Sequence, residues 1–128
     1  MIMNGKPSVP SPRTGFLLHP AAALHDVGWG HPEHQGRMRY LASAVSKDML
    51  ALHDKVAQME VRSATEEEIL RVHERDLLER VQEAVDRALE EERAVPLDPD
   101  TLVSGASWDA AVGSSGAVLT AVDAMAKG

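Results

Sequence analysis

A stretch from Leu24 to Leu41, LHDVGWGHPEHQGRMRYL, carries most of the side chains in this sequence that could do chemistry. Imidazole nitrogens and carboxylate oxygens are ligands that zinc accepts in proteins. Five such groups lie in the stretch: His25, Asp26, His31, Glu33 and His34. Their spacing does not match a known short zinc motif, such as His-Glu-x-x-His on one helical face. A metal site is therefore one interpretation, and a polar loop whose histidines bond to backbone is the one we prefer.

Hydroxyl and imidazole groups elsewhere offer fewer possibilities. Four serines lie in the last quarter of the chain: Ser104, Ser107, Ser114 and Ser115. None has the Gly-x-Ser-x-Gly context that exposes a nucleophile at a strand-to-helix turn, so we do not expect nucleophilic catalysis. His73, in RVHERDLL, could be an acid or base. A histidine at a helix break more often caps or packs, and we prefer that interpretation.

Three further charged residues could recognise a ligand: Arg37, near the end of the histidine-rich stretch, and two aspartates outside it. Asp98 and Asp100, in LDPDT, could bind a cation or accept hydrogen bonds from a substrate backbone. Alone, such aspartates are more often turn residues. Arg37 falls in the first turn of an expected helix, beside its apolar stripe. It either lies on the surface with its stem on the core or turns inward toward an anion or backbone carbonyls.

Bulk composition restricts the classes of function. The chain has 128 residues, which suits one domain, and a formal net charge of -7, which argues against a nucleic-acid surface or an electrostatic membrane anchor. It has no cysteine, so disulfides and thiolate zinc sites are excluded. No apolar run approaches the roughly 20 residues of a spanning helix. Residues 1–14 have no signal-peptide pattern and are expected to form a flexible tail, so we expect a cytoplasmic protein.

Hydrophobic periodicity predicts how these residues are positioned. We expect a buried strand at 14–20, a helix at 32–52, a strand with one buried face at 55–64, a helical region at 64–93 and a helix at 107–126.

Several residues refine these predictions. Thr65 and Glu68 have the spacing of a capping box, and the helical region is expected to break near 73–76. Prolines and glycine in 94–109 predict a loop, after which Ser107 is a possible N-cap. The last helix is rich in small residues, so other segments can pack very close to it.

Strands alternating with helices predict an α/β layer architecture. Only two strands are visible, which is too few for an independent parallel sheet. The chain is therefore expected to be the first part of something larger.

Four segments in this order resemble the histone deacetylase superfamily, which includes acetoin-utilization proteins and acetylpolyamine amidohydrolases. The segments are TGFLLHP, HDVGWGHPEHQGRM, ATEEEILRVHERDLLERV and LDPDTLVSGASWDAAVGSSGAVLTAVDAM. The resemblance implies a partial arginase/deacetylase fold over residues 15–128, with few parallel strands and several flanking helices. It also implies a parent activity, the zinc-dependent hydrolysis of acetyl-lysine or acetylpolyamine amides, in which metal-bound water attacks the carbonyl.

The resemblance also assigns roles to residues of this sequence. It implies that Trp29, Gly30, His31 and Pro32 form a wall of the substrate tunnel. Arg37 would line the internal cavity. Either Asp98 or Asp100 would be the rim aspartate that binds the substrate backbone.

The family's Gly-His-His segment, zinc ligands and oxyanion tyrosine have no counterpart in this sequence. No zinc ligand or catalytic residue can therefore be assigned, and we expect a segment that binds no zinc and is inactive alone. The partner would be a complementary C-terminal deacetylase segment or a second copy of the chain. The alternative is a non-catalytic interaction or oligomerisation module derived from the fold.

Overall fold

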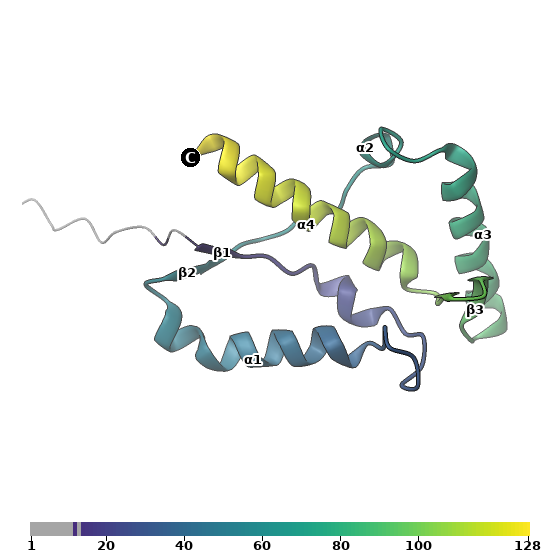
Figure 1. Cartoon of the computed structure of the whole chain (residues 1–128), viewed down its shortest axis with the longest axis horizontal. Helices are drawn as coiled ribbons and strands as arrows, with labels where there is room; N and C mark the ends of the chain where they lie inside the picture. Colours follow the sequence, from purple (N-terminus) through teal and green to yellow (C-terminus); the bar gives the residue numbers. More distant parts are fainter. Residues whose placement is uncertain (1–11, 13) are drawn as a thin grey trace, which may run out of the picture.

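The computed structural model describes residue 12 and residues 14–128. Nearly all of the predicted tail thus lies outside the described residues. The described elements, in chain order, are β1 (Thr14–Phe16), the 3-10 helix η1 (Pro20–Leu24), α1 (Gly36–Leu52), β2 (Val56–Gln58), α2 (Glu66–Ile69), α3 (Arg75–Glu91), β3 (Val95–Asp98), β4 (Thr101–Val103) and α4 (Ser107–Lys127). In Figure 1, α1 and α4 run along the molecule, with β1 and β2 at one end and α3 with β3 at the other.

The first two strands confirm the predicted α/β class. β1 pairs with β2 in parallel, with Thr14 opposite Val56 and Phe16 opposite Gln58. The prediction of a buried strand at 14–20 is wrong in length and burial: β1 ends at Phe16, only half-buried, and the chain enters η1 at Pro20. The reason is that this two-stranded sheet has no further strand among the described residues to extend or cover it.

Helix α1 begins later than the pattern predicted. Residues 31–35 form turns, and the helix starts at Gly36 rather than at Pro32. Gly36 is buried because the rings of Trp29 and His34 lie directly against it, where a β-carbon would clash. The predicted apolar face is present in part: Met38, Ala42, Val45, Met49 and Leu52 are half-buried. Leu41 and Leu50, predicted on the same face, are exposed.

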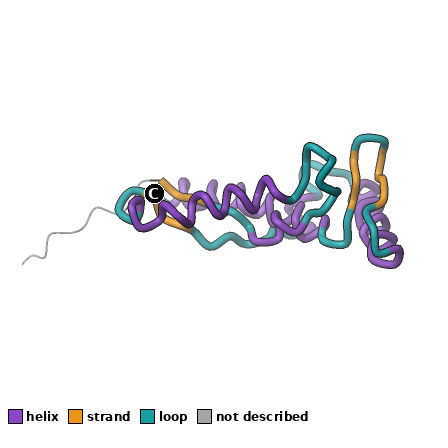
Figure 2. The backbone as a smooth tube through the Cα atoms, turned by 90° about the horizontal axis from the view of Figure 1, so that it is seen from below, coloured by secondary structure: helices purple, strands orange, loops and turns teal. Residues whose placement is uncertain are grey.

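The segment predicted as a loop at 94–109 contains a hairpin instead. β3 and β4 pair antiparallel, with the buried Val95 opposite the buried Val103. Prolines at 96 and 99 suggested a loop, but Pro99 lies in the turn between the strands. Each strand of the hairpin also has one unpaired edge, and the Pro96 carbonyl faces it, since it accepts from Arg87; a proline there costs no ladder hydrogen bond. Figure 2 shows this hairpin standing at one end of an elongated molecule, next to a helix. Its valines form the main apolar cluster with α3, whose members are Ala84, Val85, Ala88, Val95 and Val103, with Leu97 and Trp108 packed against them.

The predicted capping box and helix break are both confirmed. The Thr65 hydroxyl accepts from the Glu68 backbone N–H at 3.2 Å, and the Glu68 carboxylate accepts from the Thr65 N–H at 2.9 Å. The helical region then divides into α2 and α3.

Among the described residues, no helix has both the length and the apolar character needed to cross a membrane.

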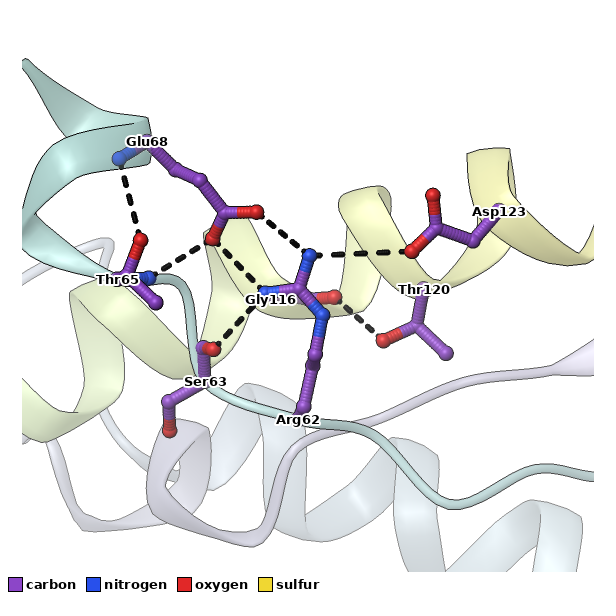
Figure 3. Close-up of polar contacts among 7 residues, drawn as sticks. All are labelled: Arg62, Ser63, Thr65, Glu68, Gly116, Thr120 and Asp123. Atoms are coloured by element: carbon purple, nitrogen blue, oxygen red, sulfur yellow. Dashed lines mark hydrogen bonds and ion pairs between the residues drawn. The ribbon is translucent and has the colours of Figure 1, made fainter.

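The Glu68 carboxylate also attaches α2 to the chain before it through Arg62, which in turn approaches α4. Arg62 donates two hydrogen bonds to Glu68, at 2.7 and 2.8 Å, and lies 3.8 Å from the carboxylate of Asp123 on α4 (Figure 3). A bidentate guanidinium–carboxylate pair fixes orientation as well as distance. Arg62 therefore acts as a clamp between the 62–65 segment, α2 and α4.

Beside this clamp, the backbone of residues 62–64 lies directly on α4. The Ala64 N–H donates to the Val112 carbonyl at 2.8 Å. A β-carbon at Gly116 would collide with the Arg62 carbonyl oxygen and the Ala64 nitrogen, which are backbone atoms and cannot move independently. The prediction that small residues allow close packing on the last helix is confirmed at this position.

Replacement of Gly116 by alanine should therefore destabilise the protein by about 1–3 kcal/mol through overpacking. In an exposed helix the same change would stabilise the chain, because glycine is a poor helix former. Urea unfolding measures the difference. Ser115→Ala, at an exposed position of α4, is the matched control and should stay within about 0.5 kcal/mol of wild type. A Gly116→Ala protein as stable as wild type would contradict the close approach.

The clamp should also give the folding stability a specific pH dependence. Hydrogen bonds from Arg62, and then from the Thr65 backbone, lower the pKa of Glu68 from 4.5 to about 2. A carboxyl group whose pKa is lowered on folding adds stability above its unfolded pKa and loses it as pH falls toward the folded pKa. The Glu68 contribution should thus be complete above pH 4.5 and disappear as the pH falls to about 2.

Denaturant unfolding at a series of pH values tests this expectation. Between pH 4.5 and 2, the free energy of unfolding should fall less steeply for Glu68→Gln than for wild type. Parallel pH profiles for the two proteins would show that the Glu68 pKa is not shifted by folding.

Candidate functional site

The segment between η1 and α1, residues 25–35, is called the opening loop here. Val27 is buried and anchors its first part. The chain then turns at Gly28, whose φ of +88° lies in the left-handed region that favours glycine. The Gly28 N–H donates to the Asp26 carboxylate at 3.0 Å, which closes the turn. The residues that follow are thus directed to the surface.

The four residues predicted as a tunnel wall lie together on this surface. Trp29 is 61% exposed, and its ring lies 5.2 Å from that of His34 at a tilt of 32°. Gly30 and Pro32 are exposed, and His31 is half-buried. The His31 Nδ1 atom accepts from the Glu33 N–H at 3.1 Å, which folds the loop onto itself. These four residues thus form a partly aromatic surface, and its role as a wall toward a substrate stays a prediction.

Arg37 lies in the first turn of α1 and forms an ion pair with Glu33, one turn before it. Its side chain is 46% exposed, so it does not enter a closed interior in this chain. It does line a cavity of about 340 Å³ between the opening loop and α4, together with His25, His34 and Ser107. The exposure and the ion pair with Glu33 agree with the surface interpretation of Arg37. Its role toward an internal cavity stays a prediction.

Asp98 and Asp100 occupy the tip of the β3–β4 hairpin. A hydrogen bond with the Thr101 side chain, and then one from the Asp100 backbone, lower the pKa of Asp98 below its usual range. The Asp100 N–H donates to Asp98 at 2.9 Å, as in a turn closed by an aspartate. Over residue 12 and residues 14–128, no hydrogen bond or ion pair engages the Asp100 carboxylate. Asp98 is thus committed to the turn, whereas Asp100 faces solvent.

The residues present do not fit a catalytic zinc ion. Within the described part of the chain, no group of three or more histidine, aspartate or glutamate side chains is close enough to hold a metal. The histidines of the opening loop are engaged elsewhere: His25 with Ser107, His31 with the Glu33 backbone, and His34 against Gly36. The Nδ1 atom of His34 is buried and packs on the helix start, and no group among the described residues makes a hydrogen bond to it.

A small buried hydrogen-bond network joins the opening loop to α4. The Ser107 hydroxyl lies 2.7 Å from His25 Nδ1, and 3.1 Å from the Ser104 hydroxyl. The Ser104 N–H donates to Ser107 Oγ at 2.7 Å, and the Asp26 N–H donates to Ser104 Oγ at 3.3 Å. We call these four residues the serine network. It joins residues that are 82 positions apart in the chain.

A serine beside a histidine is also the arrangement of an activated nucleophile. In this network, however, Ser107 Oγ contacts three groups at once and the residue is only 7% exposed. An oxygen whose lone pairs are occupied by donors cannot attack a substrate without breaking the network. The expectation that these serines are not nucleophiles agrees with this geometry.

The serine network was not predicted as a unit. Ser107 was expected to be an N-cap, but the N-cap is Ala106 and makes no side-chain hydrogen bond, so that prediction is wrong. The Ser104–Ser107 spacing of three is the only local signal in the sequence, because residues three apart at a helix start face each other. Their pairing with His25 depends on η1 packing on α4, which no local pattern encodes.

A comparison with protein families finds one relationship. The family model described as "Histone deacetylase domain" matches residues 31–128. The match includes α1 with Arg37, the hairpin with Asp98 and Asp100, and the whole of α4. A search of curated proteins finds no match.

Proposed function

Because this chain belongs to the histone deacetylase family, we propose that it supplies part of the substrate site of a deacetylase. The opening loop would form one wall of the substrate tunnel through Trp29, Gly30, His31 and Pro32. The hairpin tip would form the rim that binds the substrate backbone. Acetyl-lysine or acetylpolyamine amides are the substrate class of this site.

The observation that carries this proposal is the family match across residues 31–128, which includes His31, Pro32 and the hairpin tip. Trp29 and Gly30 directly precede the matched range, so their part in the wall rests on their place in the same loop. The geometry supports the proposal in two ways. The opening loop exposes an aromatic ring and two small or cyclic residues, which can line a channel for an alkyl chain. The hairpin tip exposes a carboxylate that can accept hydrogen bonds from an amide backbone.

Asp100 is the better candidate for the rim aspartate. One Asp98 oxygen already accepts the Asp100 N–H, and the Thr101 side chain also bonds to Asp98. Using Asp98 for a substrate would compete with the turn that shapes the rim. Asp100 can bind a substrate without that cost, so we propose that Asp98 holds the turn and Asp100 meets the ligand.

The metal centre of the proposed site comes from outside this chain. Zinc supplies the activated water in such a site when it is bound, and the described residues bring together no donor set for it. A complementary deacetylase segment would provide the ligands, the proton-transferring groups and the remaining strands. Arg37, at the border of the cavity, would then face that segment.

The proposal predicts that the purified chain alone does not hydrolyse an acetyl-lysine peptide, with or without added zinc. The physical reason is that no described group can hold the ion that activates water. Turnover is measured by release of the free amine, and bound zinc by elemental analysis after dialysis. Zinc-dependent turnover that a chelator abolishes, together with stoichiometric bound zinc, would contradict the proposal.

A second function is favoured by the apolar surface of α4. Val118 and Val122 are 64% and 58% exposed and Met125 is 83% exposed, all on one helix. Val118 also lines an apolar groove of about 570 Å³ between α4 and the α2–α3 corner, with Ile69, Val72 and Leu77 on its other wall. Exposed apolar surface of this kind marks sites of protein association. The chain could thus act as a non-catalytic interaction module that pairs with itself.

Light scattering coupled to size exclusion tests self-association. If the α4 face pairs with a second copy, the measured mass should approach twice 13.8 kDa, and Val122→Lys should return it to the monomer value because a buried unpaired charge is costly. A monomer at all concentrations would remove the second function. The first would stand, since it needs a different segment rather than a second copy.

A further inference from the structure

The opening loop packs through Val27 and against Gly36 of α1, but it has few polar attachments beyond α1. Beyond Asp26 its hydrogen bonds are local: the His31 N–H donates to the Gly28 carbonyl and the His34 N–H to the His31 carbonyl, at 3.2 and 3.1 Å. Bonds of this kind shape a loop but do not locate it on a fold. The polar contacts that locate it are at its base, where His25 and Asp26 meet the serine network.

The direction of each hydrogen bond in this network follows from the atoms involved. The backbone N–H groups of Asp26 and Ser104 can only donate, so the two hydroxyl oxygens must accept from them. The contact between Ser107 and His25 can then run either way, because the two hydroxyls can rotate together. The network therefore stays bonded whichever imidazole nitrogen carries the proton.

Ser107 does not serve its own helix through this hydroxyl. It is the first residue of α4, and its Oγ accepts from Ser104, which precedes the helix. Ser104 directly follows β4, the second strand of the hairpin. One buried hydroxyl thus connects the base of the opening loop, the base of the hairpin and the first turn of α4.

We propose that Ser107 is a positioning residue: with Ser104, it holds His25 and Asp26 and thereby sets where the opening loop stands relative to the hairpin. The inference rests on the proposed function only because it takes the opening loop as the wall and the hairpin as the rim of one substrate site. The placement itself follows from the contacts that Ser104 and Ser107 make with the base of the loop. Both serines are buried, at 9% and 7% exposure.

Hydrogen–deuterium exchange with peptide-level mass spectrometry tests the placement. In Ser107→Ala the Ser104 N–H and His25 Nδ1 lose their partner, so the amides of residues 24–35 should exchange about tenfold faster. Exchange in α3 should stay at the wild-type rate. Ser107→Thr keeps a hydroxyl on the same carbon and should restore the wild-type exchange of the loop.

Two further variants make the outcome decisive. Ser114→Ala, at an exposed position bordering the same cavity, should leave the loop unchanged. His25→Phe removes the imidazole while the bonds between Ser104 and Ser107 remain, and should accelerate loop exchange as Ser107→Ala does. If Ser107→Ala does not fold, the His25→Phe variant alone shows whether the serine network positions the loop.

Unchanged loop exchange in Ser107→Ala or His25→Phe would overturn the proposal. So would an equal acceleration in the loop and in α3, because that result means a global loss of stability rather than a released loop. The readout needs no deacetylase activity, so its failure would leave the proposed function standing, and the turnover assay would not decide the role of Ser107.

Discussion

The structure depends on how closely other segments approach the backbone of α4. At Gly116 the carbonyl of Arg62 occupies the space of a β-carbon, and at Gly113 the ring of His19 does the same. Because the backbones lie so close, the Ala64 N–H can donate a hydrogen bond to the Val112 carbonyl. The absence of side chains at Gly113 and Gly116 thus allows one helix to hold the chain before α2 and the chain before the opening loop. Larger residues at these two positions would keep both segments away from the helix, and the loops would have no common support.

Each attachment along α4 then has a separate role. His19 on Gly113 fixes η1, and the serine network fixes the opening loop a few residues further along the chain. At the other end Arg62 ties Glu68 and Asp123 together. The opening loop and the hairpin are therefore arranged by contacts within this chain, whereas its described residues bring together no group of donors that could hold a metal.

Sequence alone predicted the features that depend on neighbouring residues. The capping box of Thr65 and Glu68, the break before α3 and the small-residue helix are confirmed, because each follows from local spacing. The strand predicted at 55–64 is only partly right, since burial alternates from residue 57 to 62 but β2 ends at Gln58. Sequence-based prediction failed where the local structure depends on contacts with residues distant in the chain. The β3–β4 hairpin forms because Val95 and Val103 share a core with α3, which outweighs the turn signals of two prolines. The start of α1 moved because Trp29 and His34 fold over Gly36, and the role of Ser107 depends on a residue 82 positions away.

Helix α4 holds the loops of the proposed site in place through contacts within the chain, without a metal ion. Amide exchange of the wild-type chain, followed residue by residue by NMR, tests it most directly when zinc is compared with a chelator. The Ala64 amide and the amide of Asp26 should be protected to the same degree in both conditions, since their acceptors are the Val112 carbonyl and the Ser104 hydroxyl. Protection of these two amides that is present only with zinc would contradict the account, because the loops would then be ordered by the metal.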